Sequence, residues 1–485
     1  MPAGRSAWLM YLGLDLGTSG LKALVIDDDQ RVVAQATAPL EVSRPRSGWS
    51  EQDAASWIEA CKASVMDLPS DVRSAVKAIG LSGQMHGAVM LDAADAPLGP
   101  CILWNDTRSA NEADEMDADP KWRDITGNIV FPGFTAPKLV WARKHQPDVF
   151  ERTRRVLLPK DFLRLWLTGE AVSEMSDAAG TSWLDTAKRD WSDVLLAETG
   201  LSREQMPRLV EGSEVSGVLR KEVADLFGMS AIPVAGGGGD NAASAIGMGV
   251  VKAGQAFVSL GTSGVLFAAN DGHQPDPSTA VHTFCHAVPD TWHQMGVILA
   301  CTDALNWASG LFQTTAAQLT GNLGDLQAPG KAHFLPYLGG ERTPLASASV
   351  RAGFLGLEHA TTREDLTRAV LEGTCFAFAD CRDVLAATGT KIERVLAVGG
   401  GTQSDYWLQA LATALDVPLM LPDAADLGGA FGAARLGMMA DTGDLSIATE
   451  PPIARTIDPD PTLTDAFKVA HIRHKRAAQF LKDTP

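Results

Sequence analysis

The chain has 485 residues, with 41 lysines and arginines against 59 aspartates and glutamates, so its formal net charge is −18. Hydrophobic residues make up 45% of it and charged residues 21%, which is typical of globular proteins and argues against disorder, collagen and coiled coil. The length predicts two or three domains, and the acidic charge argues against sequence-independent binding to nucleic acid or to an anionic membrane. A phosphorylated ligand would therefore be bound largely through backbone amides and a metal ion.

Cysteine usage and the N-terminal segment favour a cytoplasmic protein. The six cysteines contain no Cys-x-x-Cys pair, so neither a disulfide framework nor a zinc knuckle is indicated. The apolar run at 7–14 is short and leads directly into Asp15, which is unlike a signal peptide, and the chain has no 18-residue apolar stretch. Residues 1–9 precede the first predicted strand and are interpreted either as native sequence or as an upstream leader.

The first predicted element is a β-hairpin, and its turn sequence occurs twice. Leu-Gly-Thr-Ser-Gly stands at 16–20 and again at 260–264. Each copy lies between two apolar, strand-like runs, at 11–14 and 21–26 for the first copy and at 256–259 and 265–268 for the second. We therefore expect two similar domains, each opening on a hairpin whose turn consists of small residues.

The remaining patterns alternate between helix and strand. In chain order they predict a helix over 53–66, two strands around a glycine turn over 76–91, a strand over 231–235 running into glycines and a small-residue helix, a strand over 395–398, glycines at 399–401, and a helix over 406–415. The stretches 321–330 and 451–461 are interpreted as loops, and 464–481 as a final amphipathic helix with a solvated basic face. This order is typical of α/β domains whose sheets are flanked by helices.

Glycine-rich turns between a strand and a helix are candidate phosphate-binding loops, because they expose backbone N–H groups. The only Gly-Lys pair, Gly330–Lys331, lacks the rest of a P-loop. One weak dinucleotide pattern, Gly237-x-Gly239-x-x-Ala242, has no acidic residue on the next strand to bind a ribose. The third interpretation places a nucleotide between two related domains, with its phosphates bound by the paired hairpins.

Two aspartates could supply the chemistry of such a site. Asp15 directly precedes the first turn, where a carboxylate would repel phosphate unless a cation such as Mg²⁺ lay between them. Asp240 follows Gly236–Gly239 at the start of a predicted helix, where it is either an N-cap or a general base aimed at a substrate hydroxyl. The four glycines favour the base, because a cap does not require them.

The chain resembles the FGGY carbohydrate kinases of the actin-like ATPase superfamily, most specifically the members that phosphorylate D-xylulose, from Met10 to the last helix. The resemblance is carried by Gly-Leu-Asp-Leu-Gly-Thr-Ser-Gly at 13–20, Trp-Ser-Glu-Gln-Asp at 49–53, Ser-Gly-Gln-Met-His-Gly at 82–87, Leu-Trp-Asn-Asp at 103–106, and the motifs at 133–141, 157–161, 177–181, 237–241, 335–336, 340–344, 352–357, 365–366 and 369–372. One departure is Ala142, where the family usually has a larger aliphatic residue.

The resemblance implies an α/β fold of two actin-like (ribonuclease H-like) ATPase domains with an active-site cleft between them. Their expected ranges are 1–246, which would bind the sugar, and 247–485, which would bind adenosine. A hinge is expected near 242–254. Whether the final helix, 464–481, packs back on the first domain is left open.

The resemblance also implies roles for individual residues. Asp240 would be the general base and would contact the sugar together with Met85, His86, Trp104 and Asn241, while Asp15 would bind Mg²⁺. The phosphates of ATP would be bound by Gly17, Thr18 and Ser19 and by Gly261, Thr262 and Ser263, with Gly400, Gly401 and Thr402 bordering the adenosine.

Other interpretations exist for His86 and Trp104, and a second group of residues suggests a metal site. A lone histidine such as His86 is more often a core residue, but glycines at 83 and 87 predict a tight turn that presents it. A tryptophan such as Trp104 is also more often core. His282, Cys285 and His286 suggest a metal site only weakly, because the segment alternates like a strand and has no further ligand nearby.

The implied activity is ATP-dependent phosphorylation of D-xylulose at O5. The alternatives are a kinase for another ketose or polyol, such as ribulose or glycerol, and an actin-like ATPase switch without a sugar acceptor. The expected partners are the sugar and ATP with Mg²⁺, without nucleic acid or membrane, and a homodimer is compatible with this expectation.

Overall fold

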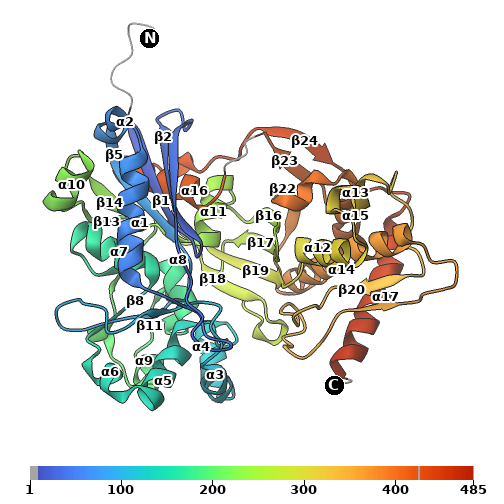
Figure 1. Cartoon of the computed structure of the whole chain (residues 1–485), viewed down its shortest axis with the longest axis horizontal. Coiled ribbons are helices and arrows are strands. Elements are labelled where there is room, and N and C mark those ends of the chain that lie inside the picture. Colours follow the sequence, from blue (N-terminus) through green and yellow to red (C-terminus); the bar gives the residue numbers. More distant parts are fainter. Residues whose placement is uncertain (1–8, 424–426, 484–485) are drawn as a thin grey trace, which may run out of the picture. The chain divides into compact units, whose positions relative to one another are not determined.

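The structure is a computed structural model that describes residues 9–423 and 427–483, so most of the segment interpreted as a leader or native start, 1–9, lies outside the described residues. The chain forms two compact units, both visible in Figure 1. Unit 1 contains the described residues up to Val251, then Phe284–Trp292 and 427–450. Unit 2 contains Lys252–Thr283, 293–423 and 451–483. Two segments from the C-terminal half of the sequence thus belong to unit 1.

The main sheet of unit 1 contains the first predicted hairpin. Its strand order is β13 (Val215–Val218), β14 (Pro233–Ala235), β5 (Val76–Gly83), β1 (Met10–Leu16), β2 (Gly20–Asp27) and β3 (Val32–Pro39), and β15 (Gly238–Gly239) also pairs with β5. Strand β1 is antiparallel to β2, which confirms the hairpin, and parallel to β5, where Asp15 is the partner of Ser82. The pairing of β1 with β5 therefore brings Asp15 next to Ser82, near the ends of both strands.

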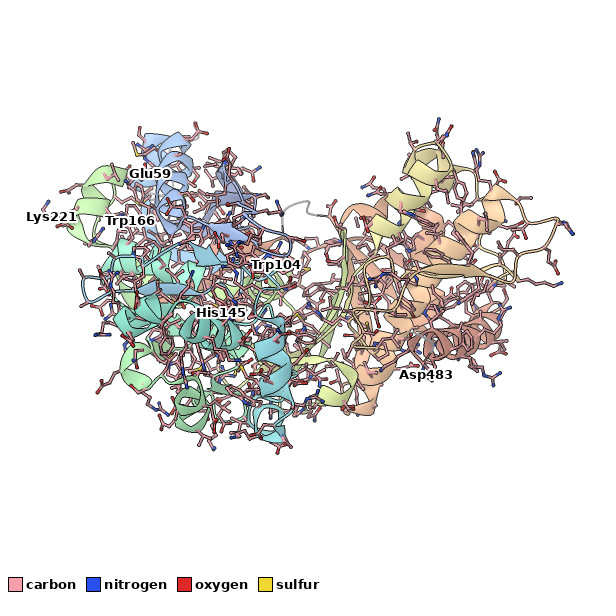
Figure 2. All side chains as sticks on the ribbon, turned by 60° about the horizontal axis from the view of Figure 1, so that its bottom comes forward. Glu59, Trp104, His145, Trp166, Lys221 and Asp483 are labelled. Atoms are coloured by element: carbon pink, nitrogen blue, oxygen red, sulfur yellow. The ribbon has the colours of Figure 1, made fainter. Side chains whose placement is uncertain are left out.

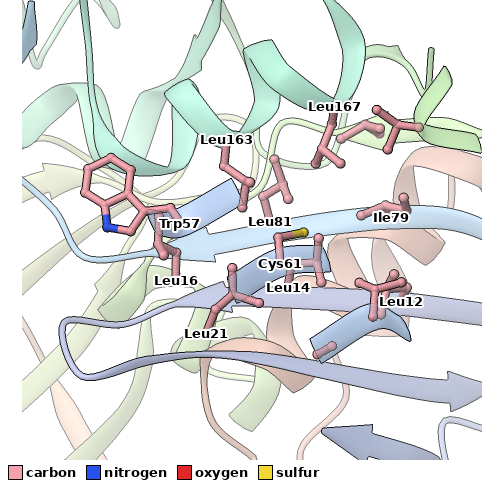
Figure 3. Packing of buried hydrophobic residues seen from close by; sticks show 14 of the residues in the cluster. Leu12, Leu14, Leu16, Leu21, Trp57, Cys61, Ile79, Leu81, Leu163 and Leu167 are labelled. Carbon is pink, nitrogen blue, oxygen red and sulfur yellow. The ribbon is translucent and has the colours of Figure 1, made fainter. Parts of the chain in front are cut away.

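The two faces of this sheet differ in side-chain size. Leu12, Leu14 and Leu16 alternate toward the face covered by α1 (Ala54–Asp67) and α7 (Pro159–Thr168), where Figure 3 shows them packed with Trp57 and Leu163. The opposite face is glycine-rich, since Gly13 and Gly80 have their Cβ positions against the backbone of α16 (Gly429–Thr442). Helix α16 packs in turn on α11 (Asp240–Met248).

The other elements of unit 1 occur in the chain segments that connect these strands and helices. They are β4 (Glu51–Gln52), α2 (Ser70–Ser74), β6 (Val89–Leu91), β7 (Cys101–Ile102), α3 (Ala110–Asp117), α4 (Pro120–Thr126), α5 (Thr135–His145), α6 (Pro147–Arg152), β8 (Arg155–Leu157), β9 (Val172–Glu174), α8 (Met175–Ala178), η1 (Ala179–Thr181), β10 (Leu184–Asp185), β11 (Asp190–Trp191), α9 (Asp193–Thr199), η2 (Arg203–Gln205), β12 (Arg208–Val210), α10 (Lys221–Phe227) and η5 (Leu445–Ile447).

A second sheet contains the second hairpin. Its order is β18 (His282–Cys285), β19 (Trp292–Ile298), β17 (Gly264–Asn270), β16 (Gly254–Leu260), β22 (Ile392–Val398), β23 (Leu419–Pro422) and β24 (Ile453–Ile457). Strands β16 and β17 are antiparallel and β16 is parallel to β22, so the pairing repeats that of β1, β2 and β5. Both predicted hairpins are thus confirmed, each within its own sheet.

Helices pack on the strands of unit 2 around a core that includes Leu260, Phe376 and Trp407. The helical elements are η3 (Pro277–Thr279), α12 (Thr302–Leu311), α13 (Ala316–Gly321), α14 (Arg363–Ala387), η4 (Gly400–Gln403), α15 (Asp405–Leu415) and α17 (Thr464–Asp483), and β20 (His333–Leu335) pairs with β21 (Gly353–Leu355). The final helix, α17, packs against α14 and α15 through Phe467 and Ala470, so it belongs to unit 2.

One loop interpretation was wrong. The stretch 451–461 contains strand β24, which among the described strands pairs with β23 alone. Proline is compatible with an edge strand, because one side of such a strand needs no ladder hydrogen bonds. Among the helices of the described residues, none has the length and apolar character needed to cross a membrane.

We expect Gly80→Ala to lower the free energy of unfolding by about 1–3 kcal/mol, since overpacking a tight contact costs about this much. The new Cβ would lie 1.7 Å from the carbonyl oxygen of Ala433, so α16 would have to move off the sheet. Thermal unfolding measures the loss. Gly99→Ala is the control, because a Cβ at Gly99 meets nothing within 4 Å. Equal melting temperatures for the two variants would contradict the close contact.

Candidate functional site

Asp15 lies at the end of β1, on the glycine-rich face of the sheet. Its carboxylate accepts a hydrogen bond of 2.8 Å from the hydroxyl of Ser82 on β5. The first residue of α16 is in contact with both groups, because a Cβ on Gly429 would lie 2.7 Å from Ser82 Oγ and 2.9 Å from Asp15 Oδ1. Asp15 is therefore near the N-terminus of a 14-residue helix, where the helix dipole favours negative charge.

Asp240 follows the glycine loop and is the first residue of α11. The N-cap position belongs to Gly239, so the N-cap interpretation of Asp240 was wrong. One carboxylate oxygen of Asp240 accepts hydrogen bonds from the backbone N–H and the side-chain amide of Asn241, at 2.7 and 2.9 Å. The neighbouring asparagine therefore holds the orientation of this half-buried carboxyl group.

Both carboxyl groups have raised pKa values, and Asp15 contributes to the shift of Asp240. Burial raises the pKa of Asp240 to about 6, and the negative charge of Asp15 contributes to that rise, against the hydrogen bonds from Asn241. Burial also raises the pKa of Asp15, while Ser82 and Lys22 act in the opposite direction. A pair of like charges with raised pKa values in one place is typical of functional sites.

Met85 and His86 lie in a tight turn, as the flanking glycines predicted. The N–H of Gly87 donates to the carbonyl of Met85 at 2.9 Å, and His86 has a φ of 68°. The side chain of Met85 is in contact with Gly239, since a Cβ there would lie 2.9 Å from its Sδ. Met85 is thus beside the residue that precedes Asp240.

The ring of His86 is held by a carbonyl group and by an aromatic ring. Its Nδ1 lies 2.7 Å from the carbonyl oxygen of Gly180, which can only accept, so Nδ1 carries a proton. The ring stacks on Phe134 with centroids 4.5 Å apart. The carbonyl of His86 accepts hydrogen bonds from Thr135 and from the buried Lys138. Burial lowers the pKa of Lys138 to about 7.

Trp104, one of the residues expected to contact the sugar, is hydrogen-bonded to the first hairpin turn. Its side chain is 44% exposed, so it is not a core tryptophan, and Figure 2 labels it. The indole N–H donates to Thr18 Oγ1 at 3.0 Å, and the Thr18 hydroxyl donates to Gln84 at 3.0 Å. Gln84 then donates to Gln52, whose amide donates to the carbonyl of Thr18 at 2.7 Å. These contacts place Trp104 beside the turn that contains Gly17, Thr18 and Ser19.

In unit 2, the second hairpin turn and the segment that contains Gly400, Gly401 and Thr402 lie close to each other. The carbonyl groups of Gly261 and Thr262 accept hydrogen bonds from the start of α12, at Cys301 and Thr302. Gly401 packs against the last residue of β16, since a Cβ on Gly401 would lie 2.8 Å from the Cβ of Leu260. The exposed turn that includes Ser263 and the 3-10 helix with Gly400 and Thr402 therefore both adjoin Leu260.

The weak metal candidates form ordinary structural contacts. Within unit 1, Cys285 Sγ lies 3.5 Å from the carbonyl oxygen of Thr186, and His286 Nε2 lies 3.0 Å from that of Val250. Burial lowers the pKa of His286 to about 4. His282 belongs to strand β18, as its alternation predicted.

Sequence reasoning assigned no role to several residues of the site. Phe134, Lys138 and Gly180 contact His86 and fall within the motifs at 133–141 and 177–181, which indicated the family. Ser82 begins the 82–87 motif and Gly429 lies in none of the motifs, and only the pairing of β1 with β5 and the return of α16 bring the two residues to Asp15.

The fold and these sites define an α/β protein with a glycine-turn hairpin in each unit and a carboxylate pair in unit 1. Residues 10–247 match the N-terminal domain of the FGGY family of carbohydrate kinases, and residues 256–440 match its C-terminal domain. The chain belongs to the FGGY family of carbohydrate kinases.

Similar proteins carry a more specific name. The chain is 49% identical over 444 residues to the xylulose kinase of Escherichia coli strain K12, covering 90% of this chain and 91% of that protein. A solved xyloylose kinase from Brucella ovis is 58% identical, with a TM-score of 0.96 over 98% of this chain and all of the other. A xylulose kinase from Rhodospirillum rubrum is 29% identical, with a TM-score of 0.91 over 97% and 99% of the two chains. These matches confirm the expected two-domain α/β fold.

We expect Asp15→Asn to lower the pKa of Asp240, because removal of a neighbouring negative charge favours the ionised form. Carbon-13 NMR titration of aspartate-labelled protein measures this pKa, with the Asp240 signal assigned by its loss in Asp240→Asn. The control is Asp71→Asn, which removes an exposed charge on α2. Identical Asp240 titrations in the two variants would show that Asp15 does not influence Asp240.

Proposed function

We propose that this chain transfers the γ-phosphoryl group of ATP to O5 of D-xylulose, giving D-xylulose 5-phosphate and ADP. The observation that carries the proposal is the half-buried Asp240, whose raised pKa and contact with Asn241 suit a general base. Family membership supports a carbohydrate acceptor, and the names of the similar proteins support xylulose.

In this proposal Asp240 accepts the proton of the sugar's 5-hydroxyl group. The transition state of phosphoryl transfer is usually loose, so the proton leaves late and a carboxylate of modest basicity is sufficient. A pKa of about 6 keeps Asp240 mainly ionised at neutral pH. Orientation by Asn241 then matters more than base strength.

The sugar would be bound by Met85, His86, Trp104 and Asn241 around Asp240. The contact between Met85 and Gly239 supports this set, because it joins the 82–87 turn to the loop of the base. His86 adds a ring whose orientation is held by Gly180 and Phe134. Trp104 adds a partly exposed aromatic face.

The phosphates of ATP would be bound by Gly17, Thr18 and Ser19 of unit 1 and by Gly261, Thr262 and Ser263 of unit 2. Both segments are hairpin turns built of small residues, which allow close approach of phosphate oxygens to backbone N–H groups. Gly400, Gly401 and Thr402 would border the adenosine, a role supported by the contact of Gly401 with Leu260.

The residues present fit a Mg²⁺ ion. Asp15 offers a carboxylate beside the Ser82 hydroxyl and interacts electrostatically with Asp240, and such oxygen donors suit Mg²⁺. Mg²⁺ is usually bound by one or two carboxylates together with phosphates and water. We therefore propose Asp15 as the metal residue, and the ion would neutralise charge on the phosphates of ATP.

We further propose that the amino acids that would bind the sugar belong to an N-terminal domain, 1–246, and those that would bind adenosine to a C-terminal domain, 247–485. We also propose that the protein is cytoplasmic. The chain passes from unit 1 to unit 2 after Val251, within the range 242–254 expected to contain a hinge. All six cysteines are free and buried, which fits a reducing compartment. A homodimer stays a prediction.

We expect D-xylulose to have the highest kcat/KM in a panel that includes D-ribulose, L-ribulose and glycerol. Coupled ADP release measures the rates, and NMR of the product identifies the phosphorylated carbon, which should be C5. A higher kcat/KM for another acceptor would replace xylulose as the substrate. Sugar-independent ATP hydrolysis without a sugar phosphate would instead favour an ATPase switch.

Asp240→Asn is expected to lower kcat by about 10²–10⁴-fold, the usual contribution of a general base, with little change in melting temperature. In the wild-type enzyme kcat/KM should fall below about pH 6, where Asp240 becomes protonated. Asp71→Asn, on the exposed surface of α2, provides the control. Near-normal turnover by Asp240→Asn would remove Asp240 from the role of base.

A further inference from the structure

A group of buried charged residues lies next to the glycine loop of Asp240. Lys160 and Arg164 on α7 face the carboxyl groups of Asp161, Glu174 and Asp177, and all five side chains are fully buried. Lys160 Nζ lies 2.9 Å from Asp161, 3.5 Å from Glu174 and 3.3 Å from Asp177. We call these five residues the buried charge cluster.

The charges within this cluster compensate one another. Burial disfavours the ammonium group of Lys160, but the three carboxyl groups outweigh that effect and raise its pKa. Burial raises the pKa of Asp177 well above its usual value despite the nearby Lys160. A buried ion cluster is weak evidence for stability, because the loss of hydration offsets the attraction between charges.

Arg164 connects the cluster to the first part of the loop. Its guanidinium group donates to the carbonyl oxygens of Ala235 at 2.6 Å and Gly236 at 2.5 Å, and to the hydroxyl of Ser216 at 2.5 Å. A planar guanidinium with several fixed donors can hold two successive carbonyl groups in one arrangement. The strand β14 and the start of the loop are thus attached to α7.

Ser176 connects the cluster to the end of the loop. Its hydroxyl oxygen accepts a hydrogen bond of 3.0 Å from the N–H of Gly239, the residue directly before Asp240. The same hydroxyl donates to Glu174, which also accepts the backbone N–H groups of Ser176 and Asp177. Glu174 is in turn 3.5 Å from Lys160. The position of Ser176 is therefore determined by the cluster.

The loop itself has little intrinsic rigidity. Gly237 has a φ of 80°, and a Cβ there would lie 2.2 Å from the carbonyl oxygen of Leu81, so a larger residue does not fit. Consecutive glycines lose much conformational freedom when they become ordered. Bonds from fixed partners at both ends of the loop restrict that freedom, and the bond at Gly239 is one residue from the carboxylate.

We infer that Ser176, held by Glu174 and the buried charge cluster, is a positioning residue that aligns Asp240 through the N–H of Gly239. The inference rests on the role proposed above for Asp240. Ser176 touches neither substrate nor reacting atoms in this proposal. It determines where the base lies, and catalytic rates are sensitive to displacements of about 1 Å.

The test compares Ser176→Ala with Ser64→Ala in the full-length protein. Ser64 is a matched control, because it is a buried serine whose hydroxyl donates only to a carbonyl of its own helix, that of Cys61. For Ser176→Ala we expect kcat for D-xylulose phosphorylation to fall about tenfold, with the KM for ATP unchanged. Amide hydrogen exchange should become faster in peptides that cover 237–241. Ser64→Ala should keep the wild-type kcat and the wild-type exchange of this loop.

Two results would overturn the inference. One is a kcat of Ser176→Ala within twofold of wild type. The other is a loss of kcat no larger than in Ser64→Ala at an equal loss of melting temperature, which would make Ser176 merely structural. Asp240→Asn distinguishes this failure from failure of the proposed function. If Asp240→Asn is inactive and Ser176→Ala is fully active, only the positioning role is wrong, whereas an active Asp240→Asn removes the role on which it rests.

Discussion

The arrangement of unit 1 depends on backbone contacts that only residues without a side chain allow. A Cβ on Gly13 would lie 1.9 Å from the carbonyl oxygen of Ala430, and a Cβ on Gly432 would lie 1.7 Å from that of Ala243. Helix α16 therefore packs tightly against β1 and β5 on one side and against α11 on the other. Since Asp15 is the second-last residue of β1 and Asp240 begins α11, this one helix sets the positions of both carboxylates.

This geometry brings two acidic groups together in a protein that is already acidic, with a net charge of −18. Burial raises the pKa of both Asp15 and Asp240, and the charge of Asp15 adds to the rise at Asp240. A polyphosphate would bind poorly to such a place without a cation. The proposed function resolves the conflict locally, because backbone N–H groups at the two turns and one Mg²⁺ ion would carry phosphate binding while the acidic surface remains.

Local patterns were sufficient to predict the hairpins, the 82–87 turn and the helix after the glycine loop, because each depends on neighbouring residues. They could not predict that α16 returns to unit 1, which depends on contacts between residues more than 300 positions apart, such as Gly80 and Ala433. Strand β24 was missed for a related reason. Within the part of the chain that the structure describes, its partner is β23 alone, and its flanking prolines locally favour a loop.

The residues of the candidate site could be predicted from the sequence, but the contacts between those residues could not. Asp240, Met85 and His86 were identified from short motifs, and the structure joins them through Gly239 and Gly180, which have no side chains to signal a contact. Ser176 and Arg164 lie just outside the motifs at 177–181 and 157–161 that indicated the family. Their contacts with the glycine loop follow only from the packing of α7 and α8 beside it.

The hydrogen bonds of Thr18 bear on how phosphate would be recognised at the first turn. A threonine hydroxyl has one proton, and that proton is donated to Gln84, while the oxygen accepts the indole N–H of Trp104. Phosphate oxygens need donors, so the Thr18 side chain cannot serve them while this network persists. Phosphate recognition at this turn would then fall to its backbone N–H groups. The hydroxyl of Thr18 would instead hold Trp104, which is proposed to contact the sugar, against the turn that is proposed to bind phosphate.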